Sequence, residues 1–339
     1  MAHTLPPLAR NRHAAHCLRC LRGVSGDLVE ADSSRMTLAF YCLSGLDVLD
    51  LVHSMPQITD TERNEWIGWI WRQQISGEYG AGFRPGPSMA INEGSKAGAL
   101  CFQSANRDGF SRLDRPDIGK LLRSTQLADG SFTPSPKWGE SDVRLVYCAF
   151  ILSSLLDDWS HIDVGKAVEF IKQCRTYEGG YGQTPGQEAQ GGTTYCSVAA
   201  LSLAKVDLTP NEREETVRWL MQRQTGGFQG RTEKTQDACY SFWCGAALQI
   251  LGAKDFVNAD ANTEFISRCQ FKFGGIAKVP DERPDPFHTY MSLASLSLYP
   301  LSKDAAAEDA ASWSITALDP VVNAQEKTAQ WARDTVSKK

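Results

Sequence analysis

The chain has 339 residues, of which 42% are hydrophobic and 22% charged, and its formal net charge is −5. These proportions are ordinary for a globular protein that buries a sizeable core. The acidic balance argues against nucleic acid as a general partner, although it leaves room for a local basic pocket.

Neither export nor membrane insertion is indicated by the sequence. The first residues do not resemble a signal peptide, and the longest apolar-rich stretch, 146–156, is far shorter than the ~20 residues that span a bilayer. Ten cysteines without an export signal favour reduced thiols over a disulfide framework. The lone CxxC pair, Cys17 and Cys20, fits two thiols on a helix. We therefore expect a cytoplasmic protein with no transmembrane segment.

In chain order, a helix is expected near 12–22, and Ser34 and Arg35 precede an apolar segment, 36–51, that predicts a buried helix. Beyond it a short unit recurs, in which glutamine is followed by a glycine-containing turn and then by an aromatic residue or isoleucine. The residue directly before the aromatic residue or isoleucine is number 82, 131, 180, 227 or 275 in the five copies. The spacings between successive copies are therefore 49, 49, 47 and 48 residues. Such a regular period predicts a repeat array.

Between the turns lie apolar stretches long enough for helices, at 144–155, 194–203, 212–222 and 240–251. An all-α fold is therefore expected, in which each repeat is a helix, a turn and a second helix, and neither helix can bury its apolar face alone. Two closures are possible, an open superhelix or a toroid of alternating inner and outer helices. The turns fall at one end of each pair, so one rim gathers 180–186, 229–234 and 278–285.

One repeat is irregular. Between residues 84 and 111 the chain lacks the long apolar helix that the other repeats carry. The sequence leaves open whether this segment is a true loop or an altered repeat.

The stretch 231–240 concentrates two cations, a carboxylate, a thiol and a phenol. Arg231 and Lys234 are three apart and can present charge-assisted donors to a phosphate. Asp237 and Cys239 are two apart, so they would not share a face if both lay mid-helix, but their side chains can converge if Asp237 lies at the N-cap of a helix. They would then form part of a catalytic zinc site. The plainer alternative is a capping Asp followed by a buried Cys.

Histidine is scarce, and of the six only His288 lies just after a Gly-Gly turn, ahead of an apolar helix. It comes one repeat after Asp237 and Cys239, at the corresponding end of the next helical pair. Adjacent inner helices of a toroid would bring the three side chains together. Asp, Cys and His leave a fourth coordination position open, which is typical of a catalytic zinc.

Over nearly its whole length the sequence resembles the β subunits of protein prenyltransferases. Residues 226–243 match that family's zinc and diphosphate motif, 284–288 match its third-ligand motif, and 142–149 and 188–196 match two further segments. The resemblance implies an α/α toroid with a central apolar funnel. The toroid is expected to form a single domain over 1–339, with helical repeats over about 34–300 and a C-terminal tail at 301–339. The implied reaction alkylates a cysteine near a protein's C-terminus with an isoprenoid and expels diphosphate.

The resemblance also implies the roles of particular residues. One Zn²⁺ is held by Asp237, Cys239 and His288, and it stabilises the thiolate of an incoming cysteine, whose free pKa is about 8.5. The catalytic set is these three ligands together with Lys278. The expected substrate-binding residues are Arg231, Lys234, Tyr240, Gln190, Gly192, Cys196, Arg144, Tyr147, Trp243, Thr37, Tyr41 and Phe287. Taken singly, Tyr147 and Trp243 could equally be ordinary core aromatics.

Two positions are similar to the type I geranylgeranyl branch of the family. Farnesyl enzymes are known for a Trp at the position of Thr37, and a Thr leaves room for one more five-carbon unit. Lys278 stands where farnesyl enzymes carry a Mg²⁺-binding Asp. The expected reaction is zinc-dependent transfer from geranylgeranyl diphosphate to the cysteine of a C-terminal CaaX motif, with Leu preferred at X and no requirement for Mg²⁺. The expected partners are a prenyltransferase α subunit in a heterodimer and CaaX proteins such as Rho-type small GTPases.

Three departures from the family's pattern leave alternatives open. Gln190 stands where the family has a diphosphate-binding His, and the residue before the zinc His is the bulky Phe287. The segment after Pro85 lacks the family's His and Thr-Tyr helix, which helps to position the peptide. A farnesyltransferase β subunit is the first alternative, disfavoured by Thr37 and Lys278. A catalytically impaired interaction subunit is the second, suggested by Gln190 and the irregular repeat.

Overall fold

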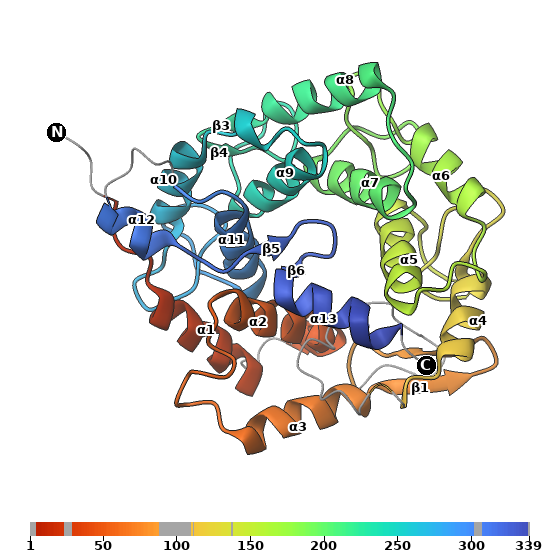
Figure 1. Cartoon of the computed structure of the whole chain (residues 1–339), viewed down its shortest axis with the longest axis horizontal. Coiled ribbons are helices and arrows are strands. Elements are labelled where there is room, and N and C mark those ends of the chain that lie inside the picture. Colours follow the sequence, from red (N-terminus) through yellow and green to blue (C-terminus); the bar gives the residue numbers. More distant parts are fainter. Residues whose placement is uncertain are drawn as a thin grey trace.

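The computed structural model describes residues 5–23, 29–87, 110, 112–136, 138–301 and 307–337. Within this part of the chain, inner and outer helices form a ring (Figure 1), and they alternate except between residues 60 and 125, where two outer helices follow one another. The irregular segment 84–111 lies largely outside the described residues, from 88 to 109 and at 111. Both alternatives for it, a loop or an altered repeat, therefore stay predictions.

The helices expected from the repeat pattern are confirmed to within a few residues. The inner helices are α2 (Arg35–Val48), α5 (Val143–Leu156), α7 (Gly191–Leu203), α9 (Ala238–Ile250) and α11 (Pro286–Leu298). The outer helices are α1 (Arg10–Arg22), α3 (Asp60–Trp71), α4 (Arg115–Thr125), α6 (Val164–Gln173), α8 (Pro210–Met221) and α10 (Ala259–Cys269). Short 3₁₀ helices lie at η1 (Val29–Ser34) and η4 (Lys254–Phe256). The turns add two antiparallel hairpins, β1 (Gln74–Gly77) with β2 (Gly80–Phe83) and β3 (Gln224–Thr225) with β4 (Gly227–Phe228).

The recurring glycine joins each repeat to the next. Its φ is positive in all five turns, including values of 113°, 92°, 100° and 97° for Gly80, Gly130, Gly179 and Gly274, a conformation that glycine adopts most readily. A Cβ at these four positions would collide with the backbone of the outer helix that comes next around the ring, at Asp117, Lys166, Glu215 and Arg12 respectively. The glycine is therefore needed both for the turn and for the close approach of the next helix.

The ring closes because the last turn meets the first helix. Gly274 lies against the backbone of Arg12 in α1. The N–H of Gly275 donates to Nδ1 of His13 at 3.0 Å, and the N–H of Ala9 donates to Oε1 of Gln270 at 2.9 Å. Helix α1 thus serves as the outer helix of the closing repeat. The toroid alternative is confirmed, and the open superhelix is excluded.

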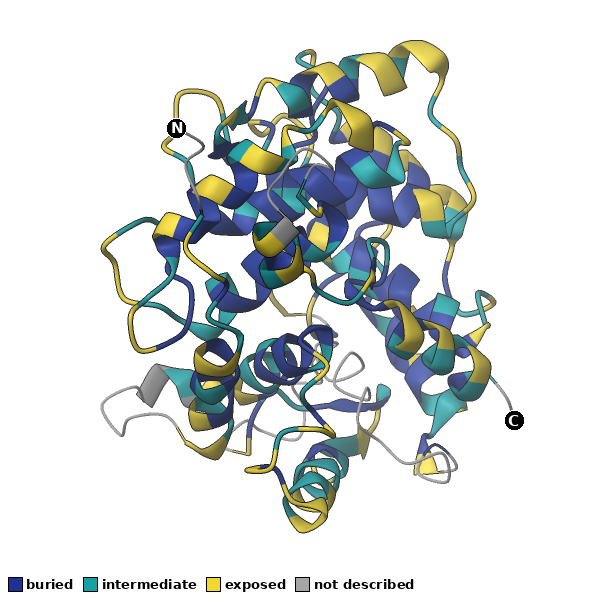
Figure 2. Ribbon diagram, turned by 60° about the vertical axis from the view of Figure 1, so that its left-hand side comes forward, coloured by how far each residue is buried: buried dark blue, intermediate teal, exposed yellow. Residues whose placement is uncertain are grey.

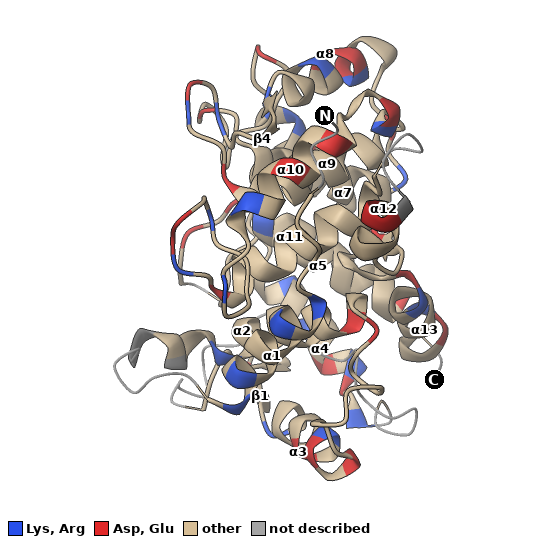
Figure 3. Cartoon of the chain, turned by 90° about the vertical axis from the view of Figure 1, so that its left-hand side faces the viewer, with Lys and Arg blue, Asp and Glu red and all other residues tan. Residues whose placement is uncertain are grey.

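The inner helices pack on one another in sequence, α5 on α7, α7 on α9, α9 on α11 and α11 on α2. Buried residues concentrate on these helices (Figure 2), whereas charged residues gather on the outer helices and connecting loops (Figure 3). Apolar burial around the ring is thus the main stabilising contribution to the fold. Among the described residues, no helix combines the length and the apolar character needed to cross a membrane.

The described part of the C-terminal tail, 307–337, is folded. It forms α12 (Ala307–Trp313), a hairpin of β5 (Leu318–Asp319) and β6 (Ala324–Gln325), and α13 (Glu326–Val336). The hairpin lies in the middle of the ring, and α13 runs between α2 and α5 (Figure 1). Buried tyrosines of three inner helices donate to its backbone: Tyr147 to Val321 at 2.7 Å, Tyr195 to Pro320 at 2.9 Å and Tyr290 to Asn323 at 2.8 Å. The tail therefore belongs to the core of the domain.

Candidate active site and metal centre

Four successive inner helices begin side by side at one rim, and each begins with a side-chain cap. Asp142, Gln190, Asp237 and Asp285 accept backbone N–H groups of the first turns of α5, α7, α9 and α11. Backbone hydrogen bonds join neighbouring starts, from Gly191 to Gly230 at 2.8 Å and from Ala238 to Lys278 at 2.9 Å. The rim therefore collects helix N-termini, whose partial positive charge attracts anions.

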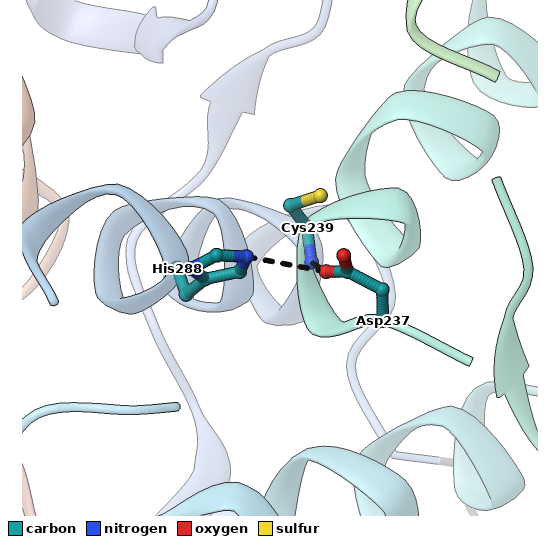
Figure 4. A group of neighbouring side chains, drawn as sticks. All are labelled: Asp237, Cys239 and His288. Atoms are coloured by element: carbon teal, nitrogen blue, oxygen red, sulfur yellow. Dashed lines mark hydrogen bonds and ion pairs between the residues drawn. The ribbon is translucent and has the colours of Figure 1, made fainter. Parts of the chain in front are cut away.

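Asp237, Cys239 and His288 converge at this rim (Figure 4). One ligand atom from each lies within 4.8 Å of those of the other two. The carboxylate of Asp237 accepts the N–H of Cys239 at 3.0 Å, and its Oδ1 is 3.3 Å from Nε2 of His288. The capping interpretation of Asp237 is therefore compatible with a metal site at the same place. Asp237 caps α9 and Cys239 is buried, and the same cap geometry brings the pair to His288.

The protonation of the three groups follows from burial and from their mutual contacts. Burial disfavours the charged imidazolium, yet hydrogen bonds to Asp237 and Asp285 raise the pKa of His288 to about 9. Burial opposes ionisation of Asp237, but hydrogen bonds from His288 and Cys239 hold the pKa of that carboxyl below its ordinary value. Burial and the nearby charge of Asp237 raise the pKa of the Cys239 thiol. A cation that binds here would displace protons from the thiol and the imidazole.

The donor set fits zinc. A carboxylate, a thiolate and an imidazole are the groups that bind Zn²⁺ in proteins, and three of them leave the open position of a catalytic site. The second ring nitrogen of His288, Nδ1, is 2.6 Å from Oδ2 of Asp285. Such a carboxylate behind a histidine is the usual support of a metal-ligating imidazole, because it fixes the orientation of the ring.

A cavity of about 380 Å³ opens beside the cluster. Every described residue that lines it was proposed from the sequence: Arg144, Gln190, Gly192, Cys196, Asp237, Cys239, Tyr240, Trp243, Lys278, Phe287 and His288. Nζ of Lys278 lies 3.9 Å from Oδ2 of Asp237. A cation therefore stands directly beside the metal-ligand candidates, while Trp243 and Phe287 supply apolar wall.

Gln190 and Arg144 are held by specific partners at the cavity wall. Oε1 of Gln190 accepts the N–H groups of Gly192 and Thr193 at 3.0 and 3.2 Å, and its Nε2 donates to the hydroxyl of Tyr240 at 3.0 Å. Nη2 of Arg144 pairs with Oδ2 of Asp142 at 2.6 Å. The capping role of Gln190 was not foreseen from the sequence.

Five residues of the proposed set lie outside the cavity lining. Arg231 is half-exposed and pairs with Glu188, Nη1 to Oε2 at 2.9 Å, and Lys234 is exposed on the same loop. Thr37 and Tyr41 lie one turn apart on α2, and the ring of Tyr41 is 5.2 Å from that of Phe287. The fifth, Tyr147, is turned toward the C-terminal hairpin.

Sequence reasoning assigned no role to Glu188, Asp285 or Asp142. Each was part of a matched motif, but none was recognised as the partner of a neighbouring functional residue. A usable signal was present for two of them. Asp285 is three residues before His288, and Asp142 is two before Arg144, spacings at which an N-cap residue can reach the first helical turn. Glu188 carried no such signal, because Arg231 is 43 residues away.

The ring of helical repeats and the three-residue candidate metal site together point to a prenyltransferase of the α/α toroid class. The sequence profile of the prenyltransferase alpha-alpha toroid domain matches residues 8–324, and the chain belongs to this family. Within the family it is similar to the geranylgeranyl transferase type-1 subunit beta of Dictyostelium discoideum, with 33% identity over 311 residues, 82% of this chain and 87% of that protein. The protein of the same name from Arabidopsis thaliana is 40% identical over 201 residues, 56% of this chain and 54% of that protein.

A solved structure shows the same fold. Candida albicans protein geranylgeranyltransferase-I complexed with GGPP superposes with a TM-score of 0.86 and 24% sequence identity, covering 98% of this chain and 100% of that chain. The resemblance found in the sequence is therefore confirmed. The chain is a prenyltransferase and a homologue of type-1 geranylgeranyl transferase β subunits.

Proposed function

We propose that the chain is the catalytic β subunit of a protein geranylgeranyltransferase of type I, which acts in the cytoplasm as a heterodimer with an α subunit. It transfers a geranylgeranyl group from geranylgeranyl diphosphate to the cysteine of a C-terminal CaaX motif, with Leu preferred at X. Rho-type small GTPases are the expected class of protein substrate. The observation that carries the proposal is the convergence of Asp237, Cys239 and His288 at a cavity that also presents Lys278 and Tyr240.

Asp237, Cys239 and His288 would hold one Zn²⁺. When bound, the ion lowers the pKa of a coordinating thiol, so that a substrate cysteine is a thiolate near neutral pH. The chain's own part is to orient the ligands, and Asp285 does this for the imidazole of His288.

The diphosphate is expected to bind at the rim of helix N-termini, where the surrounding cations contact it. The hydroxyl of Tyr240 and the ammonium of Lys278 line the cavity, and Arg231 and Lys234 lie on the loop just before Tyr240. Fixed donors and cations placed where negative charge develops stabilise the departing diphosphate. Lys278 supplies a positive charge at a place where a divalent metal could otherwise serve, so Mg²⁺ is not expected to be required.

The isoprenoid chain is expected against the apolar wall. Trp243 and Phe287 line the cavity, and Tyr41 continues this surface through its contact with Phe287. Thr37 precedes Tyr41 by four residues on α2 and therefore lies on the same helix face. A small residue there leaves space beyond the aromatic wall for the last isoprene unit.

Co-expression of the chain with an α subunit tests the proposal. The purified heterodimer is assayed with labelled geranylgeranyl or farnesyl diphosphate on peptides that end in Leu, Ser or Met. We expect geranylgeranyl transfer to the Leu peptide, undiminished by a chelator that removes Mg²⁺ but spares zinc. A preference for farnesyl diphosphate would favour the farnesyltransferase alternative. A stable heterodimer that binds the diphosphate but transfers nothing would favour the impaired interaction subunit.

A further inference from the structure

Gln190 uses both ends of its side-chain amide. Its Oε1 accepts two backbone N–H groups at the start of α7, those of Gly192 at 3.0 Å and Thr193 at 3.2 Å. Its Nε2 donates to the hydroxyl of Tyr240 at 3.0 Å. One side chain therefore ties the first turn of α7 to a phenol on α9.

The helix fixes which end of the amide faces Tyr240. If the amide were turned over, its NH₂ group would face two backbone N–H donors, and no hydrogen bond could form there. The oxygen must therefore face the helix, and the NH₂ group must face the phenol. As a result, the oxygen of Tyr240 is an acceptor toward Gln190, and its own proton has to be donated elsewhere.

The position of the Tyr240 ring is fixed by packing. It packs against two glycines, Gly191 at the start of α7 and Gly230 in the loop before α9. A Cβ at residue 191 would be 2.9 Å from Cδ1 of the ring, and a Cβ at residue 230 would collide with the ring and its hydroxyl. Because both neighbours lack a side chain, the ring fits between them with its hydroxyl at Gln190.

Within the part of the chain that the structure describes, the hydroxyl proton of Tyr240 has no acceptor, and Tyr240 and Gln190 both line the cavity of the candidate site. We propose that Gln190 is a positioning residue, whose helix-fixed amide sets the hydroxyl of Tyr240 as a hydrogen-bond donor to the diphosphate group of the isoprenoid substrate. The inference rests on the proposed function for the identity of that anion. It gives Gln190 a role that acts through Tyr240 instead of through direct charge.

Gln190 is a neutral amide, whereas the other three helix caps of the rim are carboxylates. Asp142, Asp237 and Asp285 cap their helices with carboxylates. A carboxylate at position 190 could cap α7 equally well, because it accepts hydrogen bonds. Its second oxygen, however, would also accept, so the proton of Tyr240 would turn toward it and away from the cavity. A neutral amide is the cap that leaves this proton available.

A double-mutant cycle on the heterodimer tests the proposal. Gln190→Asn keeps a capping side chain but is one methylene shorter, so that its amide no longer reaches Tyr240. We expect it to lower kcat/KM for geranylgeranyl diphosphate about tenfold, close to the loss in Tyr240→Phe. In the Tyr240→Phe background the same Asn substitution should cause no further loss. Gln190→Glu adds a negative charge that should lower kcat/KM in both backgrounds. A further loss should appear only when residue 240 is Tyr, because only then can the phenol proton turn toward the new carboxylate.

Equal losses from Gln190→Asn with Tyr240 and with Phe at position 240 would overturn the proposal, because Gln190 would then act independently of the phenol. Asp163→Ala is the matched control. It removes the side-chain cap of the outer helix α6 and should lower stability while leaving kcat/KM unchanged. The same cycle is repeated as binding of inorganic diphosphate by calorimetry. If diphosphate binds with the expected coupling but no isoprenoid is transferred, the proposed function fails while the positioning role stands. If diphosphate does not bind, the positioning role fails.

Discussion

At the scale of single residues, the site depends on what a helix cap can do. The N-cap carboxylate of Asp237 accepts the N–H of Cys239, and this bond places a carboxylate and a thiol, two residues apart, on the same side of the helix start. The next inner helix repeats the arrangement, because Asp285 caps α11 and orients His288. The metal-ligand candidates are thus held by the repeat architecture itself.

Cys239→Ala should abolish zinc binding and transfer while leaving the helix content unchanged, because the apolar ring does not depend on this thiol. Metal analysis of the purified protein gives the zinc content, and far-UV circular dichroism gives the helix content. Cys174→Ala, at another buried cysteine, is the control and should keep one zinc per chain. Full zinc occupancy in Cys239→Ala would show that the metal is held elsewhere.

Glu188→Gln should strengthen binding of the isoprenoid diphosphate. Glu188 holds Arg231 in an ion pair at 2.9 Å in which both side chains are about half exposed. Such a pair is worth at most about 1 kcal/mol, so releasing Arg231 should lower KM for geranylgeranyl diphosphate by up to about fivefold. The measurement is KM at two salt concentrations, with a smaller effect expected at the higher one. A rise in KM would mean that Glu188 helps Arg231 to reach the substrate.

The sequence predicted that the three metal-ligand candidates lie together, but it did not predict the contacts that support them. Asp237, Cys239 and His288 occupy equivalent places in consecutive repeats, so the period alone indicated that they meet. The pairing of Glu188 with Arg231 depends on how two loops from different repeats lie against each other. The bond from Gln190 to Tyr240 depends on a ring seated between Gly191 and Gly230. Neither follows from spacing along the chain.

At the scale of elements, α2 connects the site to the C-terminal tail. Its first half carries Tyr41, whose ring packs against that of Phe287, and Thr37 one turn earlier. Its last turn carries Asp47, whose Oδ2 accepts the hydroxyl of Thr328 in α13 at 2.7 Å and whose backbone oxygen accepts Nε2 of Gln325 at 3.2 Å. The sequence predicted the helix and its buried character. It could not predict this contact, because α13 lies almost 300 residues later in the chain.

Thr37→Trp should shift the preference of the heterodimer from geranylgeranyl toward farnesyl diphosphate. An indole on this face of α2, one turn before Tyr41, would fill the space expected for the last five-carbon unit. The ratio of kcat/KM for the two diphosphates is the measurement, and Thr37→Ser, which adds no bulk, is the control. An unchanged ratio in Thr37→Trp would mean that another part of the ring limits chain length.

Asp47→Asn should stabilise the protein near neutral pH. Burial raises the pKa of Asp47 to about 6, against an ordinary value of about 3.9. A group with a raised pKa contributes its full stability below its unfolded pKa and loses it as the pH rises through the folded pKa. At pH 7.5 the unmodified chain has therefore lost on the order of 2 kcal/mol that the neutral Asn variant keeps.

Urea unfolding at pH 4 and at pH 7.5 measures this effect. The two proteins should differ little at pH 4, and the variant should be the more stable one at pH 7.5. Asp255→Asn, at an exposed carboxylate, is the control and should change stability by no more than about 0.5 kcal/mol. A destabilised Asp47→Asn variant at pH 7.5 would show that the charge of Asp47 is needed.

At the scale of the whole molecule, the ring is closed by two links that join distant parts of the chain. The first ties α1 to the last glycine turn through His13 and Gln270. The second is the C-terminal hairpin in the middle of the ring. Repeat periodicity could predict the inner and outer helices, because every repeat buries the same face. It could not predict the hairpin, because the inner-helix tyrosines donate hydrogen bonds to its backbone carbonyls, which leave no pattern in the sequence.

The second link can be tested at one hydroxyl. Tyr195 is completely buried, and its hydroxyl donates to the backbone oxygen of Pro320 at 2.9 Å. Tyr195→Phe keeps the ring packed against its neighbours but leaves a buried carbonyl without that donor, which costs about 1–3 kcal/mol. The midpoint of urea unfolding should fall accordingly. Tyr177→Phe removes a hydroxyl that is 95% exposed and should leave the midpoint unchanged. If both variants unfold at the same urea concentration as the unmodified chain, the hairpin does not stabilise the ring.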